Sequence, residues 1–145
     1  MTNLFIKCTI VLCSCLFMSL SAQGATPVTV SAVTESPVFE LRTYTTYAGR
    51  LPALNKRFKE HTIKLFEKHG MTNIGYWVPT DPEKSKNTLI YIISHKSREA
   101  AKQNWKAFVE DPEWQKVHKE SHKDGKIVEN VDSVFMSATP YSPIK

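Results

Sequence analysis

Three side chains near residue 40 have the types and the spacing to recognise an anion. Glu40, Arg42 and Tyr44 are two residues apart in a stretch with strand character, so they share one face of that strand. A guanidinium binds carboxylate or phosphate, and a phenol beside it adds a hydrogen bond, so these residues are ligand-binding candidates if their face lines a cavity. The alternative is a Glu40–Arg42 ion pair, within the chain or across a subunit interface. The alternate positions predict the core-facing side of the strand: Phe39, Leu41 and Thr43.

Aromatic residues of other predicted strands could form the apolar part of such a pocket. Trp77 and Tyr91 are the candidates, and packing in the core or in an interface is the alternative for both. Trp105 and Trp114 fall on the apolar stripes of predicted helices, which indicates a packing role.

Histidines are the candidates for proton transfer. His69 and His95 would serve as general bases if either side chain opened into a cleft. His118 and His122 are four residues apart, a spacing that suits a metal, but neighbouring lysines repel a cation and favour a solvated helix end. We therefore predict no metal site. No phosphate loop and no nucleophile-elbow motif is present, and no cofactor is predicted.

The apolar pattern predicts the elements that position these side chains. Six apolar or small residues recur at helical spacing within 50–69, Gly70 follows as a helix stop, and Ser97 and Asp111 are N-cap residues for two later helical segments. The predicted strands are 38–44, 72–78, 88–95 and 127–138, and the predicted helices are 50–69, 97–110 and 112–122.

The order β-α-β-β-α-β predicts an α+β, ferredoxin-like fold: an antiparallel four-stranded sheet with the helices on one face. The other face would carry Trp77, part of the run 89–93 and either Phe135 or Met136, which is too apolar for water. We therefore expect a homodimer in which two copies pack through their open sheet faces.

The first 25 residues have the order of a secretory signal peptide. Lys7 precedes an apolar run of about 13 residues, too short to span a bilayer, and small residues close the segment with cleavage sites after Ala22 or Gly24. An uncleaved anchor and a lipoprotein signal are the alternatives. All three cysteines lie here, so the mature chain would be exported, periplasmic or secreted, without disulfides and without stable membrane insertion.

Composition and charge complete the domain assignment. We interpret 26–37 as a linker or extended arm, 38–139 as one domain and 140–145 as a tail. The net charge is +5, but Lys and Arg alternate with Asp and Glu along the chain, which favours a solvated mixed surface over a nucleic-acid partner.

Several of these motifs together resemble the NIPSNAP family, over about 38–139. The resemblance rests on five pieces: Phe39-Glu40-Leu41-Arg42-Thr43-Tyr44, Gly70, Gly75-Tyr76-Trp77, Leu89-Ile90-Tyr91 and Phe108-Val109-Glu110-Asp111-Pro112-Glu113-Trp114. It implies a dimeric α+β barrel of ferredoxin-like subunits. It implies no catalytic residues, and the signal peptide departs from the intracellular members.

Three functions are consistent with these observations. The first is an exported domain that binds a small, partly apolar, anionic molecule between sheet and helices. The second is a cofactor-independent monooxygenase or isomerase, by analogy with related dimeric α+β barrels. The third is a structural or partner-binding dimer whose interior is filled by its own side chains.

Overall fold

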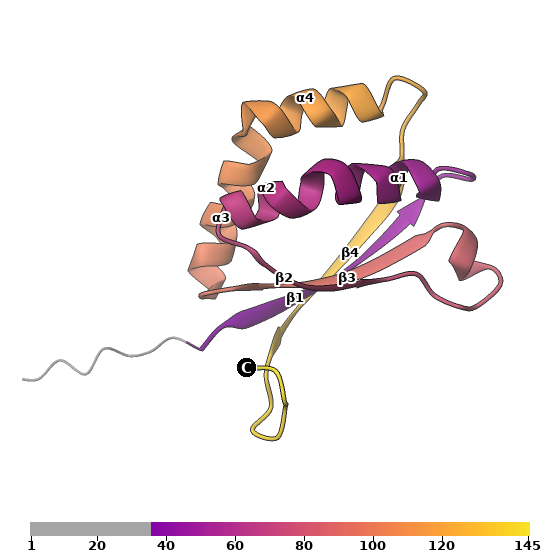
Figure 1. The fold of residues 1–145 in the computed structure, drawn as a ribbon. Helices are drawn as coiled ribbons and strands as arrows, with labels where there is room; N and C mark the ends of the chain where they lie inside the picture. The colour runs from indigo at the N-terminus through magenta and orange to yellow at the C-terminus, as the bar shows by residue number, and fades with distance from the viewer. Residues whose placement is uncertain (1–35) are drawn as a thin grey trace, which may run out of the picture. The chain divides into compact units, whose positions relative to one another are not determined.

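The computed structural model describes residues 36–145 (Figure 1). The strands are β1 (Val38–Thr46), β2 (Thr72–Trp77), β3 (Thr88–His95) and β4 (Val128–Ser137). The helical segments are α1 (Leu51–Arg57), the π-helical turn η1 (Phe58–Thr62), α2 (Ile63–Lys68), the short 3-10 turn η2 (Lys84–Lys86), α3 (Arg98–Glu110) and α4 (Pro112–Ser121). The sheet order is β2-β3-β1-β4 and every neighbouring pair is antiparallel, so the predicted ferredoxin-like arrangement is confirmed.

All of the long helices cover the same face of the sheet. In Figure 1, α1 and α2 continue one another along that face, while α3 leads into α4. The C-terminal segment lies on the opposite side of the sheet. The helix-covered face therefore forms the interior, and among residues 36–145 only this short segment lies on the other face, which we call the open face.

Local sequence signals fix the helix ends where they were predicted. Gly70 has a φ of +75°, the left-handed conformation that ends a helix and favours glycine. The Ser97 hydroxyl accepts a hydrogen bond from the backbone N–H of Ala100, and Asp111 caps α4 with Pro112 in its first turn. These caps separate α3 from α4 and set the direction of each.

The core lies between the helices and the central strands. Leu54, Phe58 and Phe66 of the first helical layer are buried, as the apolar stripe predicts. They pack against Tyr91 and other buried residues of β3. In α3, Ala101 and Phe108 are buried, whereas Val109 is 55% exposed.

The prediction of which face of β1 meets the core is wrong. The helices cover Glu40, Arg42 and Tyr44: Glu40 accepts a hydrogen bond from Trp105 of α3, and the Tyr44 ring contacts Phe58. The apolar alternates of β1 face the open side, as their pairing with the outward positions of β4 shows. The alternation of polar and apolar residues in β1 identified its two faces correctly. The assumption that the apolar face meets the helices failed, because a carboxylate can be buried when all of its hydrogen bonds are made.

Apolar side chains are exposed on part of the open face, as predicted, next to polar positions such as Thr43 and Asp132. Trp77 of β2 is 50% exposed and Val134 of β4 is 55% exposed. A depression on the same face is lined by Phe39, Ile92 and Met136 together with Ile144 of the C-terminal segment.

The predicted signal peptide and most of the predicted linker lie outside the described residues. Within 36–145, no helix has both the length and the hydrophobicity needed to cross a membrane.

Candidate functional site

Glu40 is the centre of a buried polar network beneath the helices. Its carboxylate is 1% exposed and accepts hydrogen bonds from four side chains that come from three strands and a helix. The donors are Arg42 Nη1 at 2.6 Å, Ser133 Oγ at 2.6 Å, Trp105 Nε1 at 2.7 Å and His95 Nε2 at 3.2 Å. The Glu40–Arg42 ion pair within the chain is thus the arrangement observed.

This network keeps Glu40 ionised. Burial alone would raise the Glu40 pKa, because it disfavours the charged form. The hydrogen bonds that the carboxylate accepts and the charge of Arg42 outweigh burial, so the pKa of Glu40 falls from its ordinary 4.5 to about 2. An ionised carboxylate only accepts hydrogen bonds, so His95 carries its proton on Nε2, and Nδ1 accepts from Asn104 at 3.3 Å.

Arg42 forms the floor of a cleft between the sheet and α3 and α4. Its guanidinium lies 4.3 Å from the Trp105 ring centroid and 5.5 Å from that of Tyr44. The carboxylate of Glu40 balances the charge of Arg42. The Arg42 Nε makes no hydrogen bond to any of residues 36–145. Arg42 therefore offers the cleft a polar edge rather than an unpaired charge.

The cleft, which we name the aromatic cleft, has a volume of about 550 Å³. A neighbouring cavity of about 170 Å³, which we name the inner chamber, shares Tyr44, Phe108, Trp114 and His118 with it. The aromatic cleft is lined by Arg42, Tyr44, Trp105, Phe108, Val109, Trp114, Gln115 and His118. The inner chamber is completed by Arg57, Phe58, Thr62, Phe66, Val128 and Val131. Aromatic walls with few polar groups are the usual character of a small-molecule site.

Arg57 closes the inner chamber and was not among the residues predicted from sequence. It is only 5% exposed, its Nη1 donates to Ser121 Oγ at 3.2 Å, and its guanidinium lies 5.3 Å from the centroid of the Trp114 ring. Burial lowers the pKa of Arg57. A signal for it was available, since Arg57 follows the buried Leu54 by three residues and thus belongs to the apolar stripe of its helix.

The helix is irregular immediately after Arg57. The π-helical turn η1 begins at the next residue, and the Thr62 hydroxyl donates to the Arg57 carbonyl oxygen at 3.2 Å. Single π-turns within α-helices are frequent at functional sites, because they rotate the side chains on either side of the turn.

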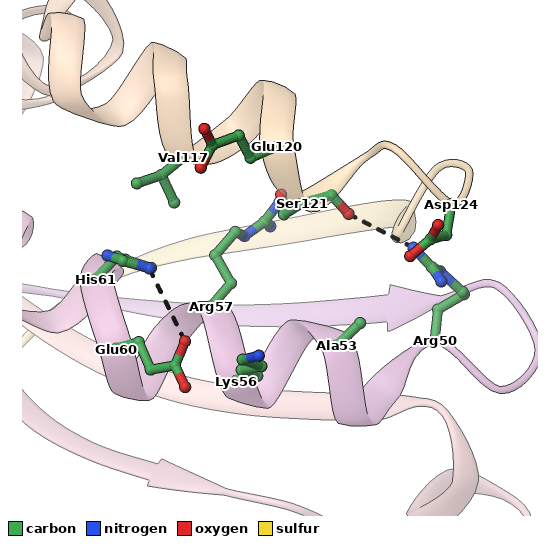
Figure 2. A pocket seen from close by; sticks show the side chains of 10 residues that line it. All are labelled: Arg50, Ala53, Lys56, Arg57, Glu60, His61, Val117, Glu120, Ser121 and Asp124. Atoms are coloured by element: carbon green, nitrogen blue, oxygen red, sulfur yellow. Dashed lines mark hydrogen bonds and ion pairs between the residues drawn. The ribbon is translucent and has the colours of Figure 1, made fainter.

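A third depression, the outer groove, lies on the other side of Arg57 between α1 and α4 (Figure 2). Its volume is about 370 Å³. Its lining combines basic, acidic and neutral residues. These are Arg50, Ala53, Lys56, Arg57, Glu60, His61, Val117, Glu120, Ser121 and Asp124. Arg50 donates to the backbone oxygens of Ser121 and Gly125, so it caps the end of α4.

His118 is the histidine that reaches the cleft. It lines both the aromatic cleft and the inner chamber, with its ring centroid 5.4 Å from that of Trp114. Burial, followed by the proximity of His122 and Arg57, lowers the pKa of His118. The His118 and His122 rings are 4.1 Å apart, but residues 36–145 contain no group of three side chains able to hold a metal.

The two histidines predicted as general bases lie elsewhere. His95 is fully buried beside Glu40, and His69 Nε2 contacts Asp111 Oδ2 at 2.6 Å. Lys68 also pairs with Asp111 at 2.7 Å, and these contacts, opposed by burial, hold the pKa of Asp111 well below its ordinary value. Neither histidine lines the aromatic cleft, so neither opens into it as the hypothesis requires.

The predicted aromatic candidates are separated by the sheet. Tyr91 is fully buried, stacked on Tyr76 and 5.3 Å from Tyr44, so it supports the floor of the cleft from within the core. Trp77 pairs with Ile90 on the open face, the side away from Arg42. The structure thus brings Arg42 and Tyr44 together in one cleft and leaves Trp77 outside it.

The sheet order, the helices on one face and the cleft between them define an α+β domain of the ferredoxin-like class. The NIPSNAP family model matches residues 39–143, and the chain belongs to the NIPSNAP family. No curated protein sequence matches the chain.

Solved structures share this fold at low sequence identity. A NIPSNAP family protein of unknown function from Agrobacterium tumefaciens (atu4242) has a TM-score of 0.66 and 21% identity, covering 77% of this chain and 96% of that one. An uncharacterized NIPSNAP-like domain protein from Burkholderia xenovorans has a TM-score of 0.64 and 15% identity. The match covers 75% of this chain and 90% of that one. A monooxygenase from the gene ActVA-Orf6 of Streptomyces coelicolor, in complex with nanaomycin D, has a TM-score of 0.50 and 13% identity. The match covers 72% of this chain and 89% of that one.

Proposed function

We propose that this NIPSNAP-family chain is an exported protein that binds a small, partly apolar, anionic molecule in the aromatic cleft. The observation that carries the proposal is the cleft itself, with about 550 Å³ of space walled by Tyr44, Trp105, Phe108 and Trp114. Aromatic walls supply apolar area and ring contacts to a flat ligand. The side chains of residues 36–145 leave this volume unfilled, which argues against a module whose interior is packed by its own residues.

Native mass spectrometry of the purified protein tests the proposal. We expect a small molecule that stays bound in gentle conditions and is released on denaturation. Trp114→Leu removes one wall without touching the Glu40 network and should lower the occupancy. Val134→Leu, on the open face, is the control and should keep it. A wild-type protein that carries no ligand and gives no tryptophan fluorescence change with added 2-naphthoate or 2-naphthamide would contradict the proposal.

We also propose that two copies associate through the open sheet face. Trp77 and Val134 are about half exposed there, and the neighbouring apolar residues of β1, β3 and β4 extend the same surface. A sheet with one apolar face uncovered is stabilised when a second copy buries it, and twofold symmetry makes the same patch serve both partners.

The oligomer is tested with two matched substitutions. Val134→Lys places a charge on the open face and should shift the sedimentation coefficient from dimer to monomer. Val109→Lys is the control, because Val109 has the same 55% exposure but lies on α3. A wild-type protein that sediments as a monomer at micromolar concentration would exclude this interface.

A cofactor-independent oxygenase or isomerase is the second candidate, and His118 is the observation that favours it. The pKa of His118 is lowered, so its imidazole is neutral at neutral pH and able to accept a proton from an acidic ligand in the cleft. The similar fold of the Streptomyces coelicolor monooxygenase is consistent with this chemistry as an analogy only. Oxygen uptake with a panel of hydroxynaphthalenes should require His118 and be lost in His118→Asn. Equal uptake by wild type and variant would remove His118 from the mechanism.

A further inference from the structure

Arg57 is a buried guanidinium that no carboxylate of residues 36–145 neutralises. It is 5% exposed, and its hydrogen bond to Ser121 Oγ involves a neutral partner. Its Nε is buried and makes no hydrogen bond to the described residues. Arg42, by comparison, is paired with Glu40 at 2.6 Å. A desolvated charge without a counter-charge destabilises a folded protein, so its presence beside a cavity points to an anion that arrives from outside.

The two cavities that meet at Arg57 differ in their suitability for an anion. In Figure 2, Arg57 extends from α1 toward α4, with the carboxylates of Glu60, Glu120 and Asp124 around the outer groove. These three acids offset the charges of Arg50, Lys56 and Arg57, so the lining of the outer groove has no net positive charge to attract an anion. Among residues 36–145, no acidic side chain lines the inner chamber, and Trp114 lies against the guanidinium there. An anion is therefore favoured on the inner side of Arg57.

We propose that Arg57 is the receptor for the carboxylate of an aromatic carboxylic acid bound in the inner chamber and the aromatic cleft. This inference rests on the proposed ligand-binding function and names the chemical class of the ligand. One unpaired cation is balanced by one negative charge, which a carboxylate carries at neutral pH and a phosphate monoester exceeds. A guanidinium also binds a carboxylate through two parallel hydrogen bonds, and Nε–H is one of the donors available for it.

The test compares three probes with the same ring: 2-naphthoate, its neutral isostere 2-naphthamide, and 2-naphthyl phosphate. Binding to the purified protein is followed by tryptophan fluorescence and by calorimetry. Wild type should bind 2-naphthoate about tenfold or more tightly than 2-naphthamide, the gain of one charge-assisted contact, and more tightly than 2-naphthyl phosphate. Arg57→Met should lose the preference for the acid and keep the affinity for the amide. Arg57→Lys should keep part of the preference.

Lys56→Met is the matched control. It removes the same charge from the neighbouring position, but Lys56 is exposed and lines only the outer groove. This variant should retain the wild-type preference. If Lys56→Met and Arg57→Met weaken the binding of 2-naphthoate equally, the effect of Arg57 is one of general charge and not of specific contact. The inference then fails.

The possible outcomes separate this inference from the function on which it rests. If Arg57→Met keeps the preference for 2-naphthoate, or wild type has none, the anion receptor is wrong while ligand binding in the cleft stands. If wild type binds neither the acid nor the amide, the cleft is not a ligand site and both proposals fall.

A measurement on the wild-type protein avoids dependence on a variant that fails to fold. Arginine Nε–H resonances are observed directly by ¹H–¹⁵N NMR. The Arg57 signal should shift on addition of 2-naphthoate and remain in place with 2-naphthamide. An Arg57 signal that responds equally to the acid and the amide, or to neither at saturation, would overturn the assignment.

Discussion

The buried carboxylate of Glu40 makes a specific prediction about stability. Glu40→Gln keeps the size of the side chain but removes the charge that four donors surround. The lowering of the Glu40 pKa from 4.5 to about 2 corresponds to ~3 kcal/mol of folding stability at neutral pH. We therefore expect Glu40→Gln to reduce the free energy of unfolding by about 3 kcal/mol at pH 7, which agrees with the cost of breaking a buried ion pair.

The pH dependence gives this prediction its sign. The pKa of Glu40 is lower in the folded state than in the unfolded state, so its stabilisation is complete above pH 4.5 and is lost as the pH falls toward 2. Glu40→Gln has no ionisable group at this position, so its stability lacks this pH-dependent contribution of the carboxylate at every pH. The difference in unfolding free energy between wild type and Glu40→Gln should therefore narrow steadily between pH 5 and pH 2.

Urea unfolding followed by circular dichroism, repeated at several pH values from 7 to 2, measures both effects. Glu129→Gln is the control, since it makes the same substitution at an exposed position of β4 and should change stability by less than about 0.5 kcal/mol. A difference between wild type and Glu40→Gln that stays constant across this pH range, or that is below about 1 kcal/mol at pH 7, would refute the assignment of Glu40 as a paired, ionised group.

Three further substitutions test local features of the fold by thermal or urea unfolding. Gly70→Ala should cost ~1–3 kcal/mol, because the added methyl group is strained at φ +75° and lies 3.3 Å from Asn104 Oδ1; an unchanged midpoint would contradict the left-handed helix stop. Ser97→Ala should cost ~1 kcal/mol by removing the hydrogen bond to the Ala100 N–H, and no loss would mean that the cap is unimportant. Arg57→Met should stabilise the ligand-free protein by ~1 kcal/mol, because it removes an uncompensated buried charge; a loss of stability would assign Arg57 a structural role.

Several helix ends were predictable because each has a local cause, whereas the π-helical turn η1 inside the predicted helix 50–69 was not predicted. Gly70 ends the first helical layer and Asp111 caps α4, and both depend on residues adjacent in sequence. Strand alternation also holds in β4, where Val131 and Ser133 face the helices while Val134 faces outward. These features require no knowledge of distant contacts.

The orientation of β1 was not predictable from its own residues. A rule based on polarity places Phe39 toward the helices and Glu40 away from them. The structure has the reverse, although Phe39 is also buried, on the other face of the sheet. The reason is non-local, since the donors to Glu40 come from positions as distant as Trp105 and Ser133, 65 and 93 residues further along the chain. A buried carboxylate becomes acceptable only when these partners converge, and sequence spacing does not reveal that convergence.

In the candidate site, too, the residues related by local sequence were predictable and those brought together by distant contacts were not. Arg42 and Tyr44 were identified correctly as neighbours on one face, because strand alternation is local. Arg57 and His118 come from two different helices, and only the packing of α1 against α4 places both beside the inner chamber. The charge of Arg42 is also changed by tertiary structure, since Glu40 neutralises it.

The Glu40 network determines which cation in the cleft is available to a ligand. Glu40 joins β1 to α3 through Trp105 and holds the Arg42 guanidinium against the Trp105 ring, so the floor of the cleft is rigid and electrically balanced. Among residues 36–145, no carboxylate pairs with Arg57 beside the inner chamber. The preference for an anion therefore arises at the inner end of the cleft, while the floor contributes shape and ring contacts. Substitutions at Glu40 should accordingly weaken 2-naphthoate and 2-naphthamide together, whereas substitutions at Arg57 should separate the two.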